Sequence, residues 1–185
     1  MKRNDGMHSK LAKIKYKLQN ARVDWAIFAG AAASCYGSKR EITDIDILVR
    51  CEDLEKVRTA LKNVDVEGFD VGCGANIETS EGVCPFFLDD EMVERINSKD
   101  LFGVVVPVMS VEDNIVLKAI LQRGEDKGKH DLEDIRFMAA YEKIDLEYLQ
   151  KRVAKSNADK RVMPLLRLLI PSLSRKQHCR KCNKP

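Results

Sequence analysis

Residues 43–49, Thr-Asp-Ile-Asp-Ile-Leu-Val, decide how we interpret this chain of 185 residues. The stretch lies in a pattern that predicts a strand over residues 42–49, and side chains two positions apart on a strand share a face. Asp44 and Asp46 are therefore expected to project together. Two adjacent carboxylates repel each other unless a cation lies between them, and Mg²⁺ binds one or two carboxylates together with phosphate oxygens. The alternative is an amphipathic strand whose polar face is only solvated.

Upstream, residues 28–34 read Phe-Ala-Gly-Ala-Ala-Ala-Ser and connect a strand over 23–28 to a short helix over 31–36. Small residues let backbone N–H groups approach a phosphate, and a helix N-terminus adds a favourable partial charge. Gly and Ala also permit tight packing of a helix on a sheet. Gly30 and Ser34 are thus candidate phosphate-binding residues, with close packing as the alternative.

The remaining hydrophobic periodicity predicts helices and strands along most of the chain. Strands come early and helices late, which favours an α/β (α+β) fold with a small mixed sheet flanked by helices and followed by a helical C-terminal region. We expect a core over residues 1–109, a helical region over 110–170 packed on it, and a basic tail over 171–185. Pro107 places its strand at an edge or terminus of the sheet. The further elements expected are helices over 7–21, 52–63, 89–97, 110–123, 130–141, 145–154 and 163–170, and strands over 69–73, 75–79 and 104–109.

Taken in order, six residues resemble the signature of the polymerase-β-like nucleotidyltransferase superfamily: Gly30, Ser34, Arg40, Thr43, Asp44 and Asp46. The pattern is most similar to small minimal members, of the abortive-infection and aminoglycoside nucleotidyltransferase types. The resemblance spans about residues 22–140. It departs from the family where Gly30 is followed by Ala31, since the family often has Gly-Gly or Gly-Ser there.

The resemblance implies a nucleotidyltransferase fold and a metal-dependent enzyme. Such an enzyme moves a nucleoside monophosphate from an NTP to an acceptor hydroxyl and releases pyrophosphate; the acceptor is not identified. It further implies that two Mg²⁺ ions bind Asp44, Asp46 and a third carboxylate, which together are the catalytic residues. Nucleotide-binding roles would fall to Gly30, Ser34, Arg40, Thr43 and Lys118.

The third carboxylate is the ambiguous member of this set. Glu78 is the preferred candidate, on the strand expected over 75–79. Asn76 shares its face and would damage the metal site if it held that position, whereas Asp70 lies on the preceding strand. With an amide there, the chain would instead be a catalytically impaired nucleotidyltransferase fold that acts as a nucleotide-, protein- or RNA-binding module.

Lys118 also has two interpretations. By the resemblance it contacts the triphosphate, but it shares the polar stripe of its helix with Asn114 and Gln122, as a solvated surface lysine would. Downstream, Asp131 and Asp134 are weak candidates, because their spacing equally suits the charge preference of a helix N-terminus.

The overall charge of +3 hides a basic C-terminus, where residues 151–185 contain eleven Lys or Arg and the single acid Asp159. RNA or another anionic partner is a candidate ligand for this tail. Its residues His178, Cys179 and Cys182 could begin a zinc site, but a closed site needs a fourth ligand. Without a signal sequence, the six cysteines are expected to be reduced thiols. No stretch is apolar for long enough to span a bilayer, so we expect a cytoplasmic protein with no membrane partner.

Overall fold

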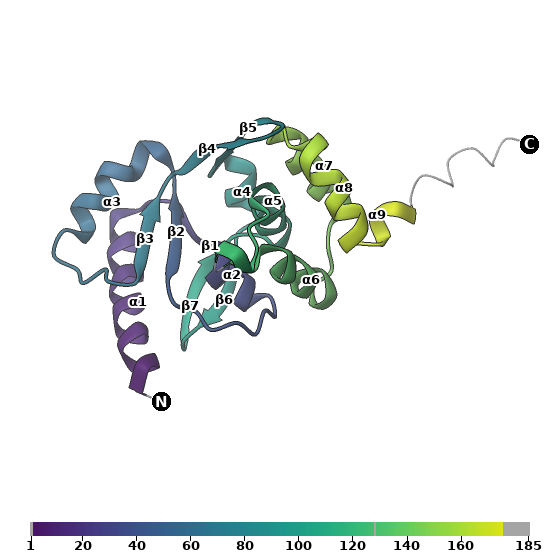
Figure 1. Ribbon diagram of the computed structural model, residues 1–185. Helices are drawn as coiled ribbons and strands as arrows, with labels where there is room; N and C mark the ends of the chain where they lie inside the picture. The colour runs from purple at the N-terminus through teal and green to yellow at the C-terminus, as the bar shows by residue number, and fades with distance from the viewer. Residues whose placement is uncertain (1, 128, 176–185) are drawn as a thin grey trace, which may run out of the picture.

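The protein, described here by a computed structural model over residues 2–127 and 129–175, contains a mixed sheet with helices on both sides (Figure 1). The sheet has the strand order β3-β2-β1-β7-β6. Strand β1 pairs antiparallel with β2 and parallel with β7, β2 pairs parallel with β3, and β6 pairs antiparallel with β7. These strands are β1 (Trp25–Phe28), β2 (Ile45–Val49), β3 (Phe69–Gly72), β6 (Asn97–Leu101) and β7 (Val104–Val108).

A separate antiparallel ribbon is formed by β4 (Gly74–Thr79) and β5 (Gly82–Phe87). It extends away from the sheet toward the C-terminal helices, and Arg161 on one of those helices pairs with Glu81 in the ribbon turn at 2.9 Å (Figure 1). The strand expected over 75–79 therefore exists, but it does not join the main sheet.

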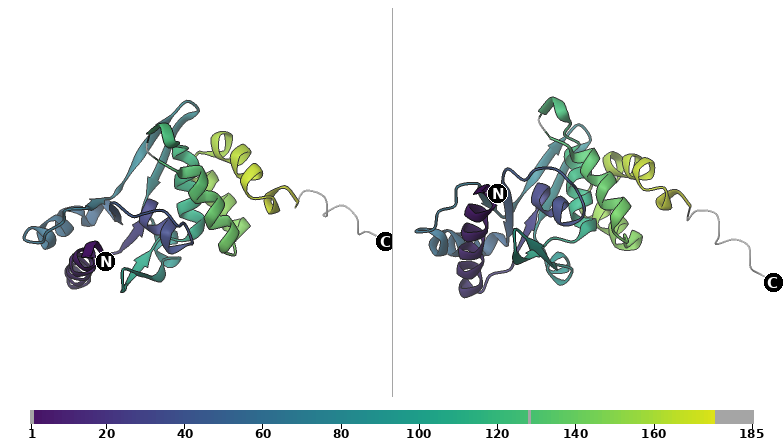
Figure 2. Two further views of the ribbon diagram at one scale, coloured as in Figure 1. Left: turned by 60° about the horizontal axis from the view of Figure 1, so that its bottom comes forward. Right: turned by 90° about the horizontal axis from the view of Figure 1, so that it is seen from below.

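Helices α1 (Lys2–Ala21) and α3 (Leu54–Leu61) lie on one side of the sheet, and α2 (Ala29–Cys35), α5 (Val111–Leu121) and α6 (Asp131–Tyr141) lie on the other (Figure 1). The C-terminal helices pack beyond α5 and α6, far from α1 (Figure 2). The other helical segments are α4 (Asp90–Glu94), α7 (Leu146–Lys155), α8 (Asp159–Leu169), α9 (Ser172–Arg175) and the 3₁₀ turns η1 (Cys51–Asp53) and η2 (Glu125–Lys127).

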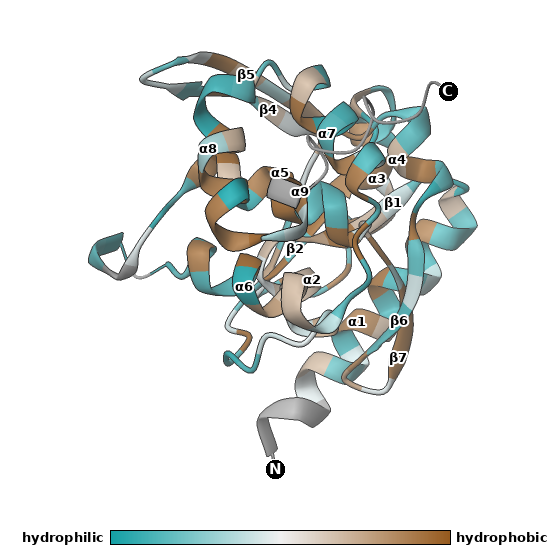
Figure 3. Cartoon of the chain, turned by 90° about the vertical axis from the view of Figure 1, so that its right-hand side faces the viewer, coloured by the Kyte–Doolittle hydropathy of each residue, from teal (hydrophilic) through white to brown (hydrophobic). Residues whose placement is uncertain are grey.

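Helix α5 lies at the centre of the helical layer, and its residues 111–120 are all buried. Figure 3 shows that much of α5 is hydrophobic. The helix begins at the start of the range expected over 110–123: Ser110 is the N-cap, and its hydroxyl accepts a hydrogen bond from the Asp113 backbone N–H at 3.1 Å. The proposed boundaries at residues 109 and 170 stay predictions.

Of the two positions that Pro107 suggested for its strand, an edge or a terminus, the edge is wrong, because β7 lies between β1 and β6. The pairing of β7 with β1 is confined to the end of the strand, at Ile27 and Val108.

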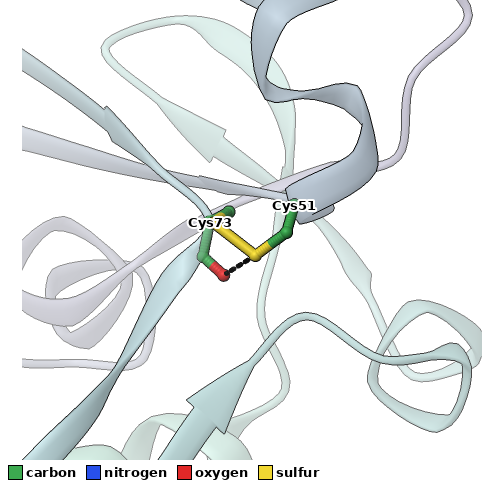
Figure 4. The surroundings of a disulfide bond; sticks show 2 residues. All are labelled: Cys51 and Cys73. Carbon is green, nitrogen blue, oxygen red and sulfur yellow. Dashed lines mark hydrogen bonds between the residues drawn. A yellow bond between two sulfur atoms is a disulfide. The ribbon is translucent and has the colours of Figure 1, made fainter.

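The expectation of reduced thiols is wrong for two of the cysteines. The thiols of Cys51 and Cys73 form a disulfide (Figure 4). The parallel pairing of β2 and β3 brings the residues that follow these strands together, with the two cysteine Cα atoms 4.8 Å apart.

The expected fold class is confirmed as a mixed α/β arrangement with a helical C-terminal region. Over residues 2–127 and 129–175, no helix is both long and apolar enough to cross a membrane.

Candidate active site

Three aspartates occupy neighbouring backbone positions where β2 and β3 begin. Asp46 is directly opposite Asp70 in the register of these parallel strands, and Asp44 lies two residues before Asp46. Asp46 is half-buried because its neighbours Ile45 and Ile47 are fully buried and fix the strand against the core. The Asp44 carboxylate accepts a hydrogen bond from the Thr43 hydroxyl at 3.0 Å. The strand register thus adds Asp70 to the two aspartates identified from the sequence.

The electrostatics of this cluster act mainly on Asp46. Burial and the negative charges of Asp44 and Asp70 raise the pKa of Asp46 from 3.8 to about 6. The positive charges of Lys129 and Arg123 act in the opposite direction. Since these two cations belong to the connection between α5 and α6, that connection faces the carboxylates from the α2 side of the sheet.

The turn from β1 into α2 lies beside this cluster, because Phe28 at the end of β1 pairs with Asp46. Its strained residue is Ala29, whose φ of 54° lies in the left-handed region that favours glycine. The buried Asn114 side chain on α5 holds this turn by donating to the Ala29 carbonyl at 3.1 Å.

Gly30 has a different reason to be glycine. A Cβ atom at Gly30 would lie 3.0 Å from the Arg40 guanidinium, so the missing side chain makes room for that cation. Ser34 lies one turn further along α2, and its hydroxyl donates to the Gly30 carbonyl at 3.3 Å. The structure therefore brings Gly30 and Arg40 together, while the Ser34 hydroxyl is used within its own helix.

Lys118 is neither solvated nor on a polar surface, so the surface interpretation is wrong. Its side chain is 2% exposed, and Nζ lies 3.1 Å from Asp131 Oδ1 and 2.7 Å from Asp134 Oδ2. Asp134 also accepts a hydrogen bond from the Ser38 hydroxyl at 2.8 Å and pairs with Arg40 at 3.3 Å. Helix α5 is covered on all sides, which is why the stripe pattern misled the assignment.

Arg123 extends this buried cluster toward the carboxylates. Its Nε and its backbone N–H both donate to Asp131 Oδ2 at 2.9 Å. Sequence reasoning passed over both Arg123 and Lys129 as site residues. The sequence did contain a signal for Arg123 and Lys129: both precede Asp131 in a connecting segment that is rich in charged residues.

Glu78 is not brought to the carboxylate cluster. It is exposed on β4 and pairs with Val83 of the ribbon, and Asn76 on the same strand pairs with Pro85. The carboxylate that the sheet places opposite Asp46 is Asp70. Of the three alternatives left open by the sequence, the geometry therefore favours Asp70 over Glu78 as the third carboxylate.

The donor chemistry of the cluster fits Mg²⁺. Its candidate ligand atoms are carboxylate oxygens, and the pKa of Asp46 is raised by burial and by the negative charges of Asp44 and Asp70, which a nearby cation would offset. Within the described residues, no three acidic, histidine or cysteine side chains converge into a ready-made metal cage. Mg²⁺ commonly takes only one or two carboxylates and obtains its remaining ligands from substrate phosphates and water. His178, Cys179 and Cys182, proposed from the sequence as zinc ligands, lie outside the described residues.

Comparison with known proteins identifies the family. Residues 52–167, more than half of the chain, match the family described as "Nucleotidyl transferase of unknown function (DUF2204)". The chain belongs to this family. This confirms the resemblance to nucleotidyltransferases drawn from the sequence, although the stretch matched to the nucleotidyl transferase family begins after Asp46.

One solved structure with a TM-score above 0.5 confirms the fold. The solution structure of the antibiotic-resistance factor ANT(2'')-Ia is similar with a TM-score of 0.58 and 12% identity, covering 87% of this chain and 96% of that one. A crystal structure of ANT(2'')-Ia in complex with adenylyl-2''-tobramycin gives a TM-score of 0.49 and 14% identity, over 86% and 99% of the two chains. An antigenic nucleotidyltransferase-like protein from Paracoccidioides brasiliensis gives 0.42 and 17%, over 88% and 91%. No curated protein matches the chain.

Proposed function

We propose that this member of the nucleotidyl transferase family is a Mg²⁺-dependent enzyme that transfers a nucleoside monophosphate from an NTP to an acceptor hydroxyl. In the transfer, the acceptor oxygen forms a bond to the α-phosphorus, and the bond from that phosphorus to the bridging oxygen breaks. Pyrophosphate leaves with the electron pair of that bond, and the acceptor loses its proton.

The observation that carries this proposal is the placement of Asp46 opposite Asp70, with Asp44 two residues before. Within residues 2–127 and 129–175, none of these three aspartates forms an ion pair, and burial together with the charges of Asp44 and Asp70 raises the pKa of Asp46. Bound Mg²⁺ would supply charge neutralisation for the attacking and leaving oxygens. We assign Asp44 and Asp46 to hold it, and Asp70, in place of Glu78, as the third carboxylate.

The cations beside the cluster are assigned to the triphosphate. Arg123 and Lys129 already act electrostatically on Asp46, and Arg40 lies against Gly30. Positive groups fixed at this point would offset the charge that develops on the leaving pyrophosphate. Thr43 orients Asp44 through its hydrogen bond, and Gly30 and Ser34 keep the turn compact beside the phosphates. Lys118 does not contact the nucleotide in this proposal. It holds Asp131 and Asp134, the two aspartates with which Arg123 and Arg40 pair.

The test is thermal unfolding with each of the four NTPs, with and without Mg²⁺. A ligand at a hundred times its Kd adds about 2.7 kcal/mol of stability. For a chain of this size that corresponds to a Tm increase of roughly 5–10 °C. We expect one or more NTPs to give such a shift only when Mg²⁺ is present.

Variants then assign the third carboxylate. Asp46→Asn and Asp70→Asn should lose the Mg²⁺-dependent shift, each judged against its own melting temperature without ligand. Glu78→Gln is the matched control and should keep the shift. If no NTP shifts the wild-type protein, the nucleotide function is rejected. A shift lost in Glu78→Gln and kept in Asp70→Asn would return the third position to Glu78.

A further inference from the structure

A second candidate site lies on the other side of the sheet, between the outer face of α1 and the connection from α3 to β3. This hollow, which we name the α1 groove, has a volume of about 660 Å³ and is lined among others by Lys10, Lys13, Tyr16, Lys17, Asn63 and Asp65. The volume lies within the range of about 300–1,000 Å³ that is typical of small-ligand pockets.

The helix presents two different faces. Leu11, Ile14 and Leu18 are fully buried and fix α1 against the rest of the protein. Lys13, Tyr16 and Lys17 lie on the opposite face at helical spacing, and the Tyr16 side chain is 63% exposed. An aromatic ring so exposed makes little contribution to the core, so its surface is available to a ligand.

The charge of the groove is only partly compensated. Lys10 pairs with Asp65 at 2.9 Å and with Glu67 at 3.5 Å, which ties the α3–β3 connection to α1 and builds the far wall. Lys13 and Lys17 form no ion pair with any residue in the described part of the chain. Lys13 acts only through the longer-range attraction of Asp65, whose pKa it helps to lower. The groove therefore combines fixed walls, two lysines without an ion-pair partner in the described residues, and the exposed Tyr16 ring.

We propose that the α1 groove binds a single-stranded nucleic acid segment. Lys13 and Lys17 contact phosphates, and one base stacks on the Tyr16 ring, a combination on which binding of single strands commonly depends. A base inside a duplex keeps its faces stacked on its neighbours and could not stack on Tyr16. Carboxylates of an acidic peptide would satisfy the two lysines but have no aromatic face to match the ring.

This site is independent of the proposed nucleotidyl transfer. Arg123 and Lys129 act on Asp46 from the α5–α6 side, whereas the α1 groove lies on the α1–α3 side of the sheet (Figure 1). Binding to the groove needs neither NTP nor metal, and an Asp46→Asn variant should keep it.

The experiment is fluorescence anisotropy of a fluorescein-labelled 12-residue oligouridylate with the full chain at low salt. Tyr16→Ala should weaken binding by roughly 5- to 150-fold, since stacking contributes about 1–3 kcal/mol per base. Tyr16→Phe keeps the aromatic face and should stay within about threefold of the wild type, on the same stacking argument. The side chains of Lys13, Tyr16 and Lys17 are exposed, so the variants at these positions are expected to fold.

A double variant, Lys13→Gln/Lys17→Gln, tests the phosphate contacts. It should bind at least tenfold more weakly and reduce the slope of log K against log salt by roughly 1.4. The charge-matched control, Lys143→Gln/Lys160→Gln, removes two exposed lysines far from the groove and should bind within about threefold of the wild type.

Three results would overturn the proposal. The first is a wild-type chain that does not bind the oligouridylate. The second is an equal loss in groove and control variants, which would place binding elsewhere, for example in the basic tail. The third is displacement by polyglutamate at the same concentration as by unlabelled oligouridylate, which would assign the groove to an acidic peptide.

Discussion

Replacing Asp46 by Asn should make the protein more stable at neutral pH, although Asp46 is a proposed catalytic residue. The carboxylate is half-buried beside Asp44 and Asp70, and its pKa is raised to about 6 by burial and by these two charges. At pH 7.5 it is ionised in a place that disfavours ionisation. The amide has nearly the same shape without the charge, so the variant escapes this cost.

The size of the gain follows from the shift in pKa. The pKa of Asp46 rises from 3.8 to about 6, and each unit corresponds to about 1.4 kcal/mol. Because part of the side chain reaches solvent, screening reduces the result, and we expect a gain of about 1–2 kcal/mol at pH 7.5. Between about pH 4 and pH 6 the native state of the wild type binds more protons than the unfolded state. Wild-type stability therefore falls as pH rises through this window, and the advantage of the variant disappears toward pH 4.

Urea denaturation of both proteins between pH 4 and pH 8 measures this difference directly. Glu94→Gln, which removes one charge from an exposed side chain, is the control and should show no such pH-dependent gain. The reasoning fails if Asp46→Asn is no more stable than the wild type at pH 7.5. It also fails if the gain is the same at pH 4 and pH 7.5, since the effect would then come from packing and not from ionisation.

Two further predictions concern the framework around the site, and both are read out by urea denaturation. Ala29→Gly should raise the free energy of unfolding by about 1 kcal/mol, because Ala29 has a φ of 54°. The control Ala31→Gly, in the buried interior of the same helix, should instead lower the free energy of unfolding. Equal effects of the two substitutions would show that the backbone conformation of Ala29 is not the cause. Lys118→Met should lower the free energy of unfolding by about 3 kcal/mol or more, because Asp131 and Asp134 would lose a buried partner at 3.1 and 2.7 Å. A loss below about 1 kcal/mol would contradict the buried pairing.

Local patterns were enough to predict what depends on near neighbours in the chain. The alternation of residues 43–49 identified β2, which spans Ile45–Val49. The helix expected over 110–123 corresponds to α5, whose N-cap hydrogen bond joins Ser110 and Asp113. In each case the deciding contacts lie within a few residues, so the sequence contains them directly.

The third carboxylate and the disulfide depend on pairing between distant segments. Glu78 and Asp70 both lie on strands, and no local pattern shows which strand joins β2. Parallel pairing of β2 with β3 decides it, and the same register brings Cys51 next to Cys73. The strand over Asn97–Leu101 was missed for a similar reason, since it is polar and exposed and is defined by its partner β7.

The distribution of charge distinguishes the ionisable groups that stabilise the fold from those that would take part in the proposed nucleotidyl transfer. Lys118 is buried and forms ion pairs with Asp131 and Asp134, so its charge is neutralised inside the protein. Arg40 and Arg123 each pair with one of these aspartates but remain 31% exposed. Three cations therefore share two carboxylates, and the surplus positive charge lies in the two arginines that reach solvent. Arg123 acts on Asp46, which with Asp44 and Asp70 carries negative charge that no ion pair in the described residues neutralises. Buried charges that neutralise each other need no ligand. Net positive charge on the arginines close to net negative charge on the aspartates suits a ligand that contains both phosphates and a divalent cation.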